Sequence, residues 1–215
     1  MRTGPVAHAL AIASACLALF AGAGAARAQP DPAIATIDNL DKALLETMKS
    51  ADALGVKGRY KKLEPVIQRT LDLPVMTRYA VGEKWSSFSD ADHQILIDAF
   101  THLTIASYAH NFDGYGGESF QIDPGVQTRN LDKIVKTKLI RPKDKPVALN
   151  YRMRQDGGEW KVIDVYYGSI SQLTIRRNDL ASAAMVGGVK ALTRNMNGQA
   201  DKLMKTPKGK DDSVG

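Results

Sequence analysis

The sequence predicts one α+β domain over residues 29–205, with helices first, an antiparallel sheet next and a helix last. Three observations predict it. The length of 215 residues and the 44% share of apolar residues suit one domain with its own core. Apolar residues recur at three- and four-residue steps before residue 112 and after residue 178, whereas residues 146–154 alternate strictly. Helical periods therefore flank a region of strand periods, which is the α+β order.

The first 28 residues are predicted to be a signal peptide rather than part of the fold. They contain Arg2 and Arg27, no acidic residue, and a middle rich in alanine and leucine. The segment ends in Ala26-Arg27-Ala28, the small-x-small pattern of a cleavage site. An uncleaved membrane anchor and lipid attachment at Cys16 stay open as alternatives. Cleavage would remove the single cysteine and lower the net charge from +6 to +4, too weak to indicate nucleic acid.

Three helices are predicted in the next part of the chain. Residues 34–54 carry an apolar stripe at helical steps, and Gly55 and Gly58 are predicted to break the helix. A second helix is expected over residues 59–71. A third begins at Pro74, because proline suits a first helical position.

The clearest helix start in the chain is Ser89, a predicted N-cap followed by Asp90 and Asp92 in the first turn. The helix that it opens is expected to run to about Phe112, before a group of glycines. Its apolar residues cover more than half of its circumference. We therefore expect this helix to be mostly buried or to border an apolar cavity.

The middle of the chain is predicted to form strands over residues 119–122, 131–140, 146–154 and 159–167. The last two are joined by a hairpin turn at Asp156-Gly157-Gly158. Because the last strand is apolar on both faces, the sequence predicts a sheet covered on both sides.

The chain is predicted to end in a helix over residues 178–204, loosened by Gly187-Gly188 and followed by a disordered tail over residues 206–215. Basic residues concentrate in residues 133–145. This segment either docks anionic lipid head groups or an acidic partner, or is a solvated strand and turn, and both interpretations stay open.

The sequence contains few residues in a spacing that catalytic or metal sites use. His93, His102 and His110 lie nine and eight residues apart on one predicted helix, a spacing that zinc and iron sites do not use. They are interpreted as surface or capping residues. Asp164 stands between two apolar residues of a strand. A structural carboxylate is the favoured interpretation, and a buried general base with a raised pKa is the alternative.

Several phrases of the sequence occur in an order and spacing that resembles a known family. Residues 73–85 read L-P-V-M-T-R-Y-A-V-G-E-K-W, and residues 89–108 begin with S-D-A-D and end in tyrosine. Residues 147–165 contain Y-R-M-R and G-E-W-K-V-I-D-V, and residues 168–171 read G-S-I-S. Together they resemble the MlaC, or toluene-tolerance, family of periplasmic lipid-binding proteins, including its hopanoid-associated HpnM branch. The resemblance covers most of residues 35–205.

The resemblance implies helices packed on a curved antiparallel sheet that encloses an apolar cavity. It implies a monomeric periplasmic carrier that shuttles a phospholipid or hopanoid-type lipid between the outer and inner membranes. The implied partners are membrane-anchored components of an ABC-type lipid transporter. Residues 172–177 read Q-L-T-I-R-R and lack the aromatic residue of the family phrase, which leaves the ligand open.

A carrier must remove its lipid from water almost completely. Two acyl chains of about sixteen carbons represent roughly 25 kcal/mol of apolar burial. The apolar helix and the two-sided strand suit the lining of such a cavity, and they also suit a dry core. We predict that nine residues contact the lipid, each with core packing as the alternative: Met76, Tyr79, Phe100, Leu103, Val147, Leu149, Tyr151, Val165 and Tyr167.

Two other functions stay open. A small enzyme on a similar curved-sheet fold would use Asp164 as acid/base, assisted by Tyr167 or His102. An adaptor protein would dock a membrane complex through its basic hairpin and would hold no ligand. The carrier is the favoured interpretation, and it predicts no catalytic residue, no metal and no cofactor.

Overall fold

The computed structural model describes Met1 and residues 31–205. Apart from Met1, the predicted signal peptide over residues 1–28 lies outside the described residues, and so does the predicted tail over residues 206–215.

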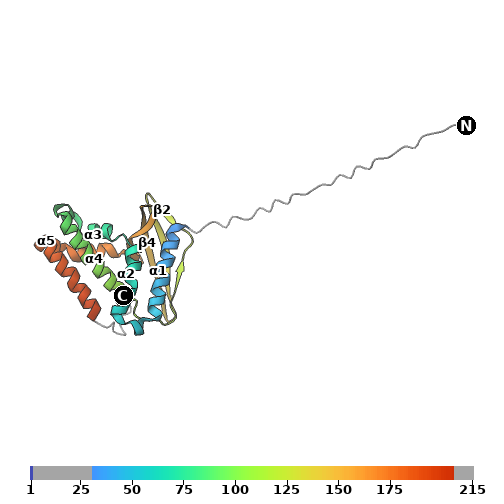
Figure 1. Ribbon diagram of the computed structural model, residues 1–215, viewed down its shortest axis with the longest axis horizontal. Helices are drawn as coiled ribbons and strands as arrows, with labels where there is room; N and C mark the ends of the chain where they lie inside the picture. The colour runs from blue at the N-terminus through green and yellow to red at the C-terminus, as the bar shows by residue number, and fades with distance from the viewer. Residues whose placement is uncertain (2–30, 206–215) are drawn as a thin grey trace.

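The chain folds into one six-stranded antiparallel sheet with helices packed against it (Figure 1), which confirms the predicted α+β class. One continuous core of buried apolar side chains joins the helices to the sheet. The elements in chain order are α1 (Pro32–Lys49), α2 (Ala51–Thr70), α3 (Leu73–Val81), the 3-10 helix η1 (Gly82–Ser87), α4 (Asp90–Asn111), β1 (Ser119–Ile122), β2 (Gln127–Arg129), β3 (Asp132–Arg141), β4 (Asp144–Asp156), β5 (Glu159–Tyr167), β6 (Ile170–Ser171) and α5 (Gln172–Lys205).

The first helix ends earlier than its apolar stripe predicts. Helix α1 stops at Lys49, and α2 begins at Ala51 after a turn at Ser50. Gly55 interrupts α2 with φ 56 and ψ 177, a conformation that residues with a β-carbon avoid. Gly58 lies inside the helix and does not break it, so the prediction of a break there is wrong. A β-carbon at Gly58 would lie 3.0 Å from Cβ of Leu54, which indicates a close approach within the turn.

The predicted starts of α3 and α4 are confirmed. Asp72 caps α3 by accepting a hydrogen bond from the backbone N–H of Val75 at 3.1 Å, and Pro74 occupies the first turn. Ser89 and Asp92 form a capping box at α4: Oγ of Ser89 accepts from the Asp92 N–H, and the Asp92 carboxylate accepts from the Ser89 N–H.

The sheet has the strand order β1-β3-β4-β5-β6, and β2 also pairs with β3. The four predicted strands are confirmed within a few residues at their ends. Strands β2 and β6, of three and two residues, are too short to show a period in the sequence. The register places Tyr151 opposite Val135 on one side and opposite Val165 on the other, so these side chains share one face.

A β-bulge in β5 changes which residues share that face. Arg152 pairs with Asp164 and Met153 pairs with Val162, so Ile163 is the extra residue. Val162 therefore faces the same side as Val165, although strict alternation would separate them. The bulge gathers apolar residues of β5 on the face that the helices cover.

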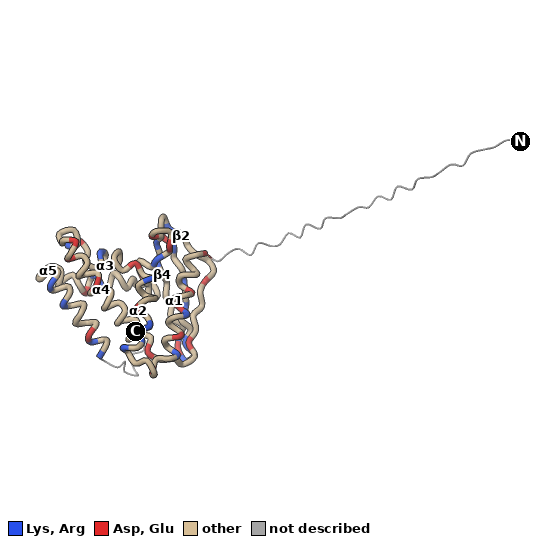
Figure 2. The backbone as a smooth tube through the Cα atoms, in the orientation of Figure 1, with Lys and Arg blue, Asp and Glu red and all other residues tan. Residues whose placement is uncertain are grey.

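The opposite face of the sheet is largely open, so the predicted cover on both sides is wrong. This outer face carries Lys136, Asn150 and Arg152, which are half-buried, and Lys138, which is exposed. Residues 133–145 do not form one basic surface, because Lys133 points to the helical side and pairs with Asp31 of the α1 cap at 2.6 Å. Figure 2 shows basic and acidic residues interleaved over much of the described chain.

Asp164 fixes the start of α5, six residues before the predicted start at residue 178. Its carboxylate accepts hydrogen bonds from the Ser171 hydroxyl at 2.7 Å and from the backbone N–H of Leu173 at 3.2 Å. Ser171 Oγ in turn accepts from the N–H of Thr174. The free amides of the first turn are thus partnered by a side chain from the sheet.

Helix α5 folds back on itself at Gly188, where φ is 55 and ψ is −145. Nη1 of Arg176 donates to Oε1 of Gln199 at 2.6 Å, although 23 residues separate them. In a straight helix these residues would lie about 34 Å apart along the axis. The two halves of α5 therefore lie side by side.

The Ser89 cap should be measurable in the stability of the fold. Ser89→Ala removes the side-chain acceptor of the capping box, and we expect a loss of about 1 kcal/mol in the free energy of unfolding in urea. Ser87→Ala is the matched control, since the Ser87 hydroxyl only donates to the carbonyl of Lys84 on the surface. Equal stability of the two variants would contradict the assigned cap.

Candidate ligand-binding cavity

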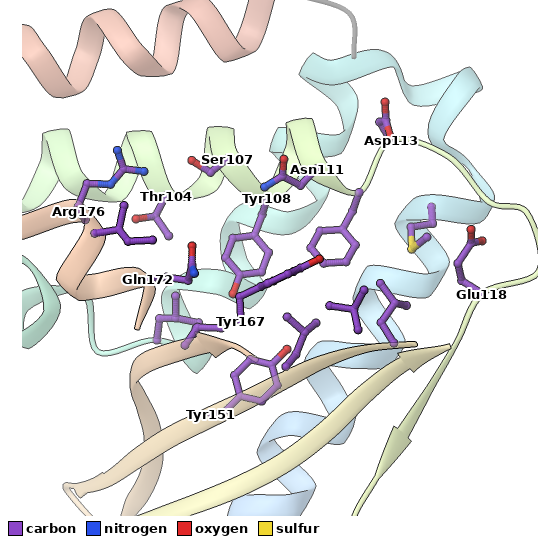
Figure 3. A pocket seen from close by; sticks show the side chains of 18 of the residues that line it. Thr104, Ser107, Tyr108, Asn111, Asp113, Glu118, Tyr151, Tyr167, Gln172 and Arg176 are labelled. Carbon is purple, nitrogen blue, oxygen red and sulfur yellow. The ribbon is translucent and has the colours of Figure 1, made fainter. Parts of the chain in front are cut away.

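A cavity of about 800 Å³ lies between the covered face of the sheet and α4 (Figure 3). Its size is in the upper part of the range for ligand pockets, and most of its lining is apolar or aromatic. The apolar and aromatic lining residues are Met48, Leu71, Met76, Phe100, Tyr108, Phe112, Leu139, Val147, Leu149, Tyr151, Val165, Tyr167, Leu173 and Ile175.

The sheet supplies one wall through consecutive positions of paired strands. Leu149 pairs with Tyr167, and Tyr151 pairs with Val165, so alternate residues of β4 and β5 point to the cavity. Val165 and Tyr167 share this face by ordinary alternation, and the bulge at Ile163 turns Val162 to the same side. The strand pattern of the sequence predicts the first two but does not show the bulge.

Helix α4 forms the opposite wall with a stripe of aromatic and polar side chains. Phe100, Thr104, Ser107, Tyr108 and Asn111 recur at helical steps and line the cavity. In Figure 3 the polar side chains of Thr104, Ser107 and Asn111 follow one another along the helix. This wall presents hydroxyl and amide groups beside aromatic rings.

The structure brings together seven of the nine residues predicted from the sequence and leaves two outside the cavity lining. Those in the lining are Met76, Phe100, Val147, Leu149, Tyr151, Val165 and Tyr167. Tyr79 does not belong to it, because it lies on the exposed side of α3 with its ring under the guanidinium of Arg177 at 5.4 Å. Leu103 points into the packed core and is only 1% exposed. The lipid contacts of the seven stay a prediction.

Sequence reasoning missed the polar part of the lining. Thr104, Ser107 and Asn111 share the helical period of Phe100, and that spacing could have placed them on the same face. Gln172 and Arg176 could not have been found, since they reach the cavity only through the early start of α5.

The two ends of the cavity differ in charge. Asp113 and Glu118 lie at one end in Figure 3, and Arg176 lies at the other. Asp52 belongs to the acidic end, because its charge and that of Asp113 both act on the buried guanidinium of Arg59. An anionic group in the cavity would therefore be less favourable at the Asp113 end.

Asp41 is a buried carboxyl behind the cavity wall. It sits on the buried stripe of α1 and is 3% exposed, and neither oxygen has a hydrogen-bond partner among the described residues. Burial raises the pKa of Asp41 to about 8, and the charge of Asp38 adds to the effect. Burial, then the charge of Asp41, likewise raises the pKa of the cavity residues Tyr108 and Tyr151 above the ordinary tyrosine range. With a pKa of about 8, the carboxyl of Asp41 is mostly protonated at pH 7.

The other titratable candidates lie apart from one another. His93 stacks on Trp85 with ring centroids 3.9 Å apart, His102 hydrogen-bonds Tyr60, and His110 donates to the carbonyl of Leu203. Asp164 is occupied at the start of α5 and does not line the cavity. Within residues 31–205, no three His, Cys, Asp or Glu side chains are placed to share a metal ion. None of the helices described there has the length and apolar character that crossing a membrane requires.

These features define a ligand-binding protein of the α+β class, with a large apolar cavity between a curved sheet and its helices. The chain belongs to the MlaC family: the family model described as MlaC protein matches residues 38–198. The fold is similar to that of a phospholipid-binding protein from Ralstonia solanacearum, solved in complex with a phospholipid. The two share 23% identity with a TM-score of 0.71, over 80% of this chain and 99% of that chain. A comparison with curated proteins found no match.

Asp41 should make stability depend on pH. An unfolded aspartate ionises near pH 4, whereas folded Asp41 keeps its proton to about pH 8. As pH rises between these values the unfolded state loses a proton that the folded state retains, so the free energy of unfolding should fall. Outside the window Asp41 should contribute no slope. Asp41→Asn should flatten the fall, measured by urea unfolding at several pH values between 4 and 9.

The exposed Asp201 of α5 provides the control for this measurement. Asp201→Asn should keep the pH dependence of the parent protein, because the substitution is at an exposed position and leaves Asp41 in place. A parent and an Asp41→Asn variant with parallel pH profiles would show that Asp41 is ionised in the folded protein.

Proposed function

We propose that the protein is a periplasmic lipid carrier and not an enzyme. The observation that carries the proposal is the cavity of about 800 Å³ with its predominantly apolar and aromatic lining. Roughly 25 kcal/mol opposes exposure of two acyl chains to water, so a carrier needs an apolar interior of this kind. Methionines 48 and 76 in the lining supply flexible, polarizable surface that adapts to chains of different shape.

The ligand that we favour is a phospholipid, and a hopanoid-type lipid is the alternative. The similar protein from Ralstonia solanacearum is a phospholipid-binding protein, which supports the first. The hopanoid alternative depends on the resemblance to the HpnM branch. The aromatic rings of Phe100, Tyr108 and Tyr167 would accept either acyl chains or a flat polycyclic skeleton.

The route that we propose runs between the outer and inner membranes, with membrane-anchored components of an Mla-type ABC transporter as partners. Membership of the MlaC family supports it. Export to the periplasm would follow cleavage of the signal peptide predicted over residues 1–28. We propose that the protein travels as a monomer, with residues 29–205 as the lipid-binding domain.

The position of Asp164 argues against the enzyme alternative. A general base must reach a substrate, yet the Asp164 carboxylate is 6% exposed and accepts from Ser171 and Leu173. It lies on the side of β5 that faces away from the cavity. Its environment gives it a structural role in holding α5.

The first test is native mass spectrometry of the protein purified from periplasm, followed by solvent extraction and identification of the lipid. We expect a stoichiometric adduct that extracts as a phospholipid or a hopanoid. A mass without ligand that is unchanged after incubation with membranes would overturn the carrier proposal.

Filling the cavity should abolish lipid binding. Leu149→Trp places a larger side chain on the cavity floor, and we expect the bound lipid in the purified protein to fall at least about tenfold. Leu131→Trp is the matched control, because Leu131 is 78% exposed and lies away from the cavity lining. Circular dichroism verifies the fold of both variants. A normal lipid content in folded Leu149→Trp protein would place the lipid elsewhere.

Asp164→Asn separates the carrier from the enzyme. The variant weakens the bonds to Ser171 and Leu173, and we expect a stability loss of about 1.5–3 kcal/mol. Lipid content by native mass spectrometry should be unchanged below the unfolding transition. Unaltered stability combined with loss of a turnover activity would instead support Asp164 as a catalytic acid/base.

A further inference from the structure

Arg176 is the cation at the end of the cavity opposite Asp113 and Glu118 (Figure 3). It lies in the first two turns of α5, in the segment 172–177 where the sequence departs from the family phrase. The second arginine of the lining, Arg141, is held at the end of β3: its Nη1 lies 3.7 Å from the carboxylate of Asp144 and its Nη2 donates to the carbonyl of Lys145, while its buried Nε has no hydrogen-bond partner among the described residues.

The guanidinium of Arg176 is held through one of its nitrogens. Nη1 donates to Oε1 of Gln199 at 2.6 Å and lies 3.8 Å from the carboxylate of Asp179. Within residues 31–205, Nε and Nη2 donate to no protein acceptor. Since an arginine carries five N–H donors, a fixed guanidinium with unused donors remains beside the cavity.

The surroundings of Arg176 favour an anionic ligand group. Only 25% of its side chain is exposed, and burial lowers the pKa of its guanidinium while Asp179 partly offsets that effect. The charge of this half-buried cation is incompletely compensated, because Asp179 lies 3.8 Å away, at the distance of a long ion pair. The amide of Gln172 and the hydroxyl of Thr104 lie at the same end of the cavity and add polar groups.

Guanidinium groups bind phosphate through charge-assisted, often bidentate hydrogen bonds. We infer that Arg176 binds the phosphate of the lipid head group at the α5 end of the cavity, and that it thereby selects phosphate-bearing lipids over neutral ones. The inference rests on the proposed carrier function. The carboxylates of Asp113 and Glu118 at the other end repel the same phosphate and so favour this direction of the lipid, although Arg141 partly offsets their charge. The acyl chains then extend along the apolar sheet wall toward Val147 and Leu139.

The test uses two soluble lipids with the same short chains, dioctanoyl-phosphatidylglycerol and dioctanoylglycerol. The delipidated protein is mixed with both at equal concentration, and the bound fraction of each is measured by native mass spectrometry. We expect the parent protein to prefer the phosphate-bearing lipid by about tenfold or more. Arg176→Gln should remove most of that preference and leave the affinity for dioctanoylglycerol unchanged.

Arg177→Gln is the matched control. This neighbouring arginine lies over the ring of Tyr79 and does not belong to the cavity lining, so its loss should leave the lipid preference intact. Arg176→Lys keeps the charge and should retain part of the preference. Both Arg176 variants lose the guanidinium that donates to Gln199, so an effect of that lost contact on folding should be common to both. A difference in lipid preference between the two variants therefore reports the charge at this position.

The outcomes distinguish this inference from the carrier function. If the parent protein binds both lipids equally, or if Arg176→Gln keeps the parent preference, the phosphate site is overturned while the carrier function stands. If Arg177→Gln loses the preference as fully as Arg176→Gln, general surface charge is responsible and the site is overturned. If the parent protein binds neither lipid, the carrier function fails as well.

Discussion

The β-bulge at Ile163 decides which side chains of β5 face the helices and which face the outer side of the sheet. By adding one residue to β5, it turns both Val162 and Val165 toward the helices and leaves Asp164 on the opposite side. Val165 lines the cavity, Val162 is buried in the core, and the outward carboxylate of Asp164 holds the first turn of α5. Strand β5 thus presents apolar residues to the helices on one side and, on the other, the carboxylate that holds the last helix.

The contact between Asp164 and the start of α5 decides which residues of α5 line the cavity. Because Asp164 fixes its start at Gln172, the first turns of α5 lie across one end of the cavity and bring Gln172, Leu173 and Arg176 into the lining. The break at Gly188 then returns the second half of the helix to Gln199, which holds the guanidinium of Arg176. The cation therefore sits at a defined position beside an apolar space.

The fold was predictable where local signals are strong. The cap at Ser89, the Pro74 start and the hairpin at Asp156 depend on neighbouring residues, and the structure has them where the sequence places them. The cover on both faces of the sheet was predicted wrongly. The prediction assumed strict alternation along β5, whereas the bulge puts Val162 and Val165 on the same face. The cavity set was recovered in large part, since hydrophobic periodicity selects inward faces. Hydrophobic periodicity could not distinguish a residue that lines the cavity, such as Phe100, from one packed in the core, such as Leu103.

The sequence by itself determined the order of helices and strands, the caps and the apolar faces, because these follow from interactions between residues a few positions apart. Tertiary structure decided where apolar faces fail to meet and leave a cavity, since that depends on the distance between α4 and the sheet. It also decided that Asp41 is buried without a partner and that Arg176 reaches the cavity. These outcomes depend on contacts between residues far apart in the chain, such as Asp164 with Leu173 and Arg176 with Gln199, which no local pattern encodes.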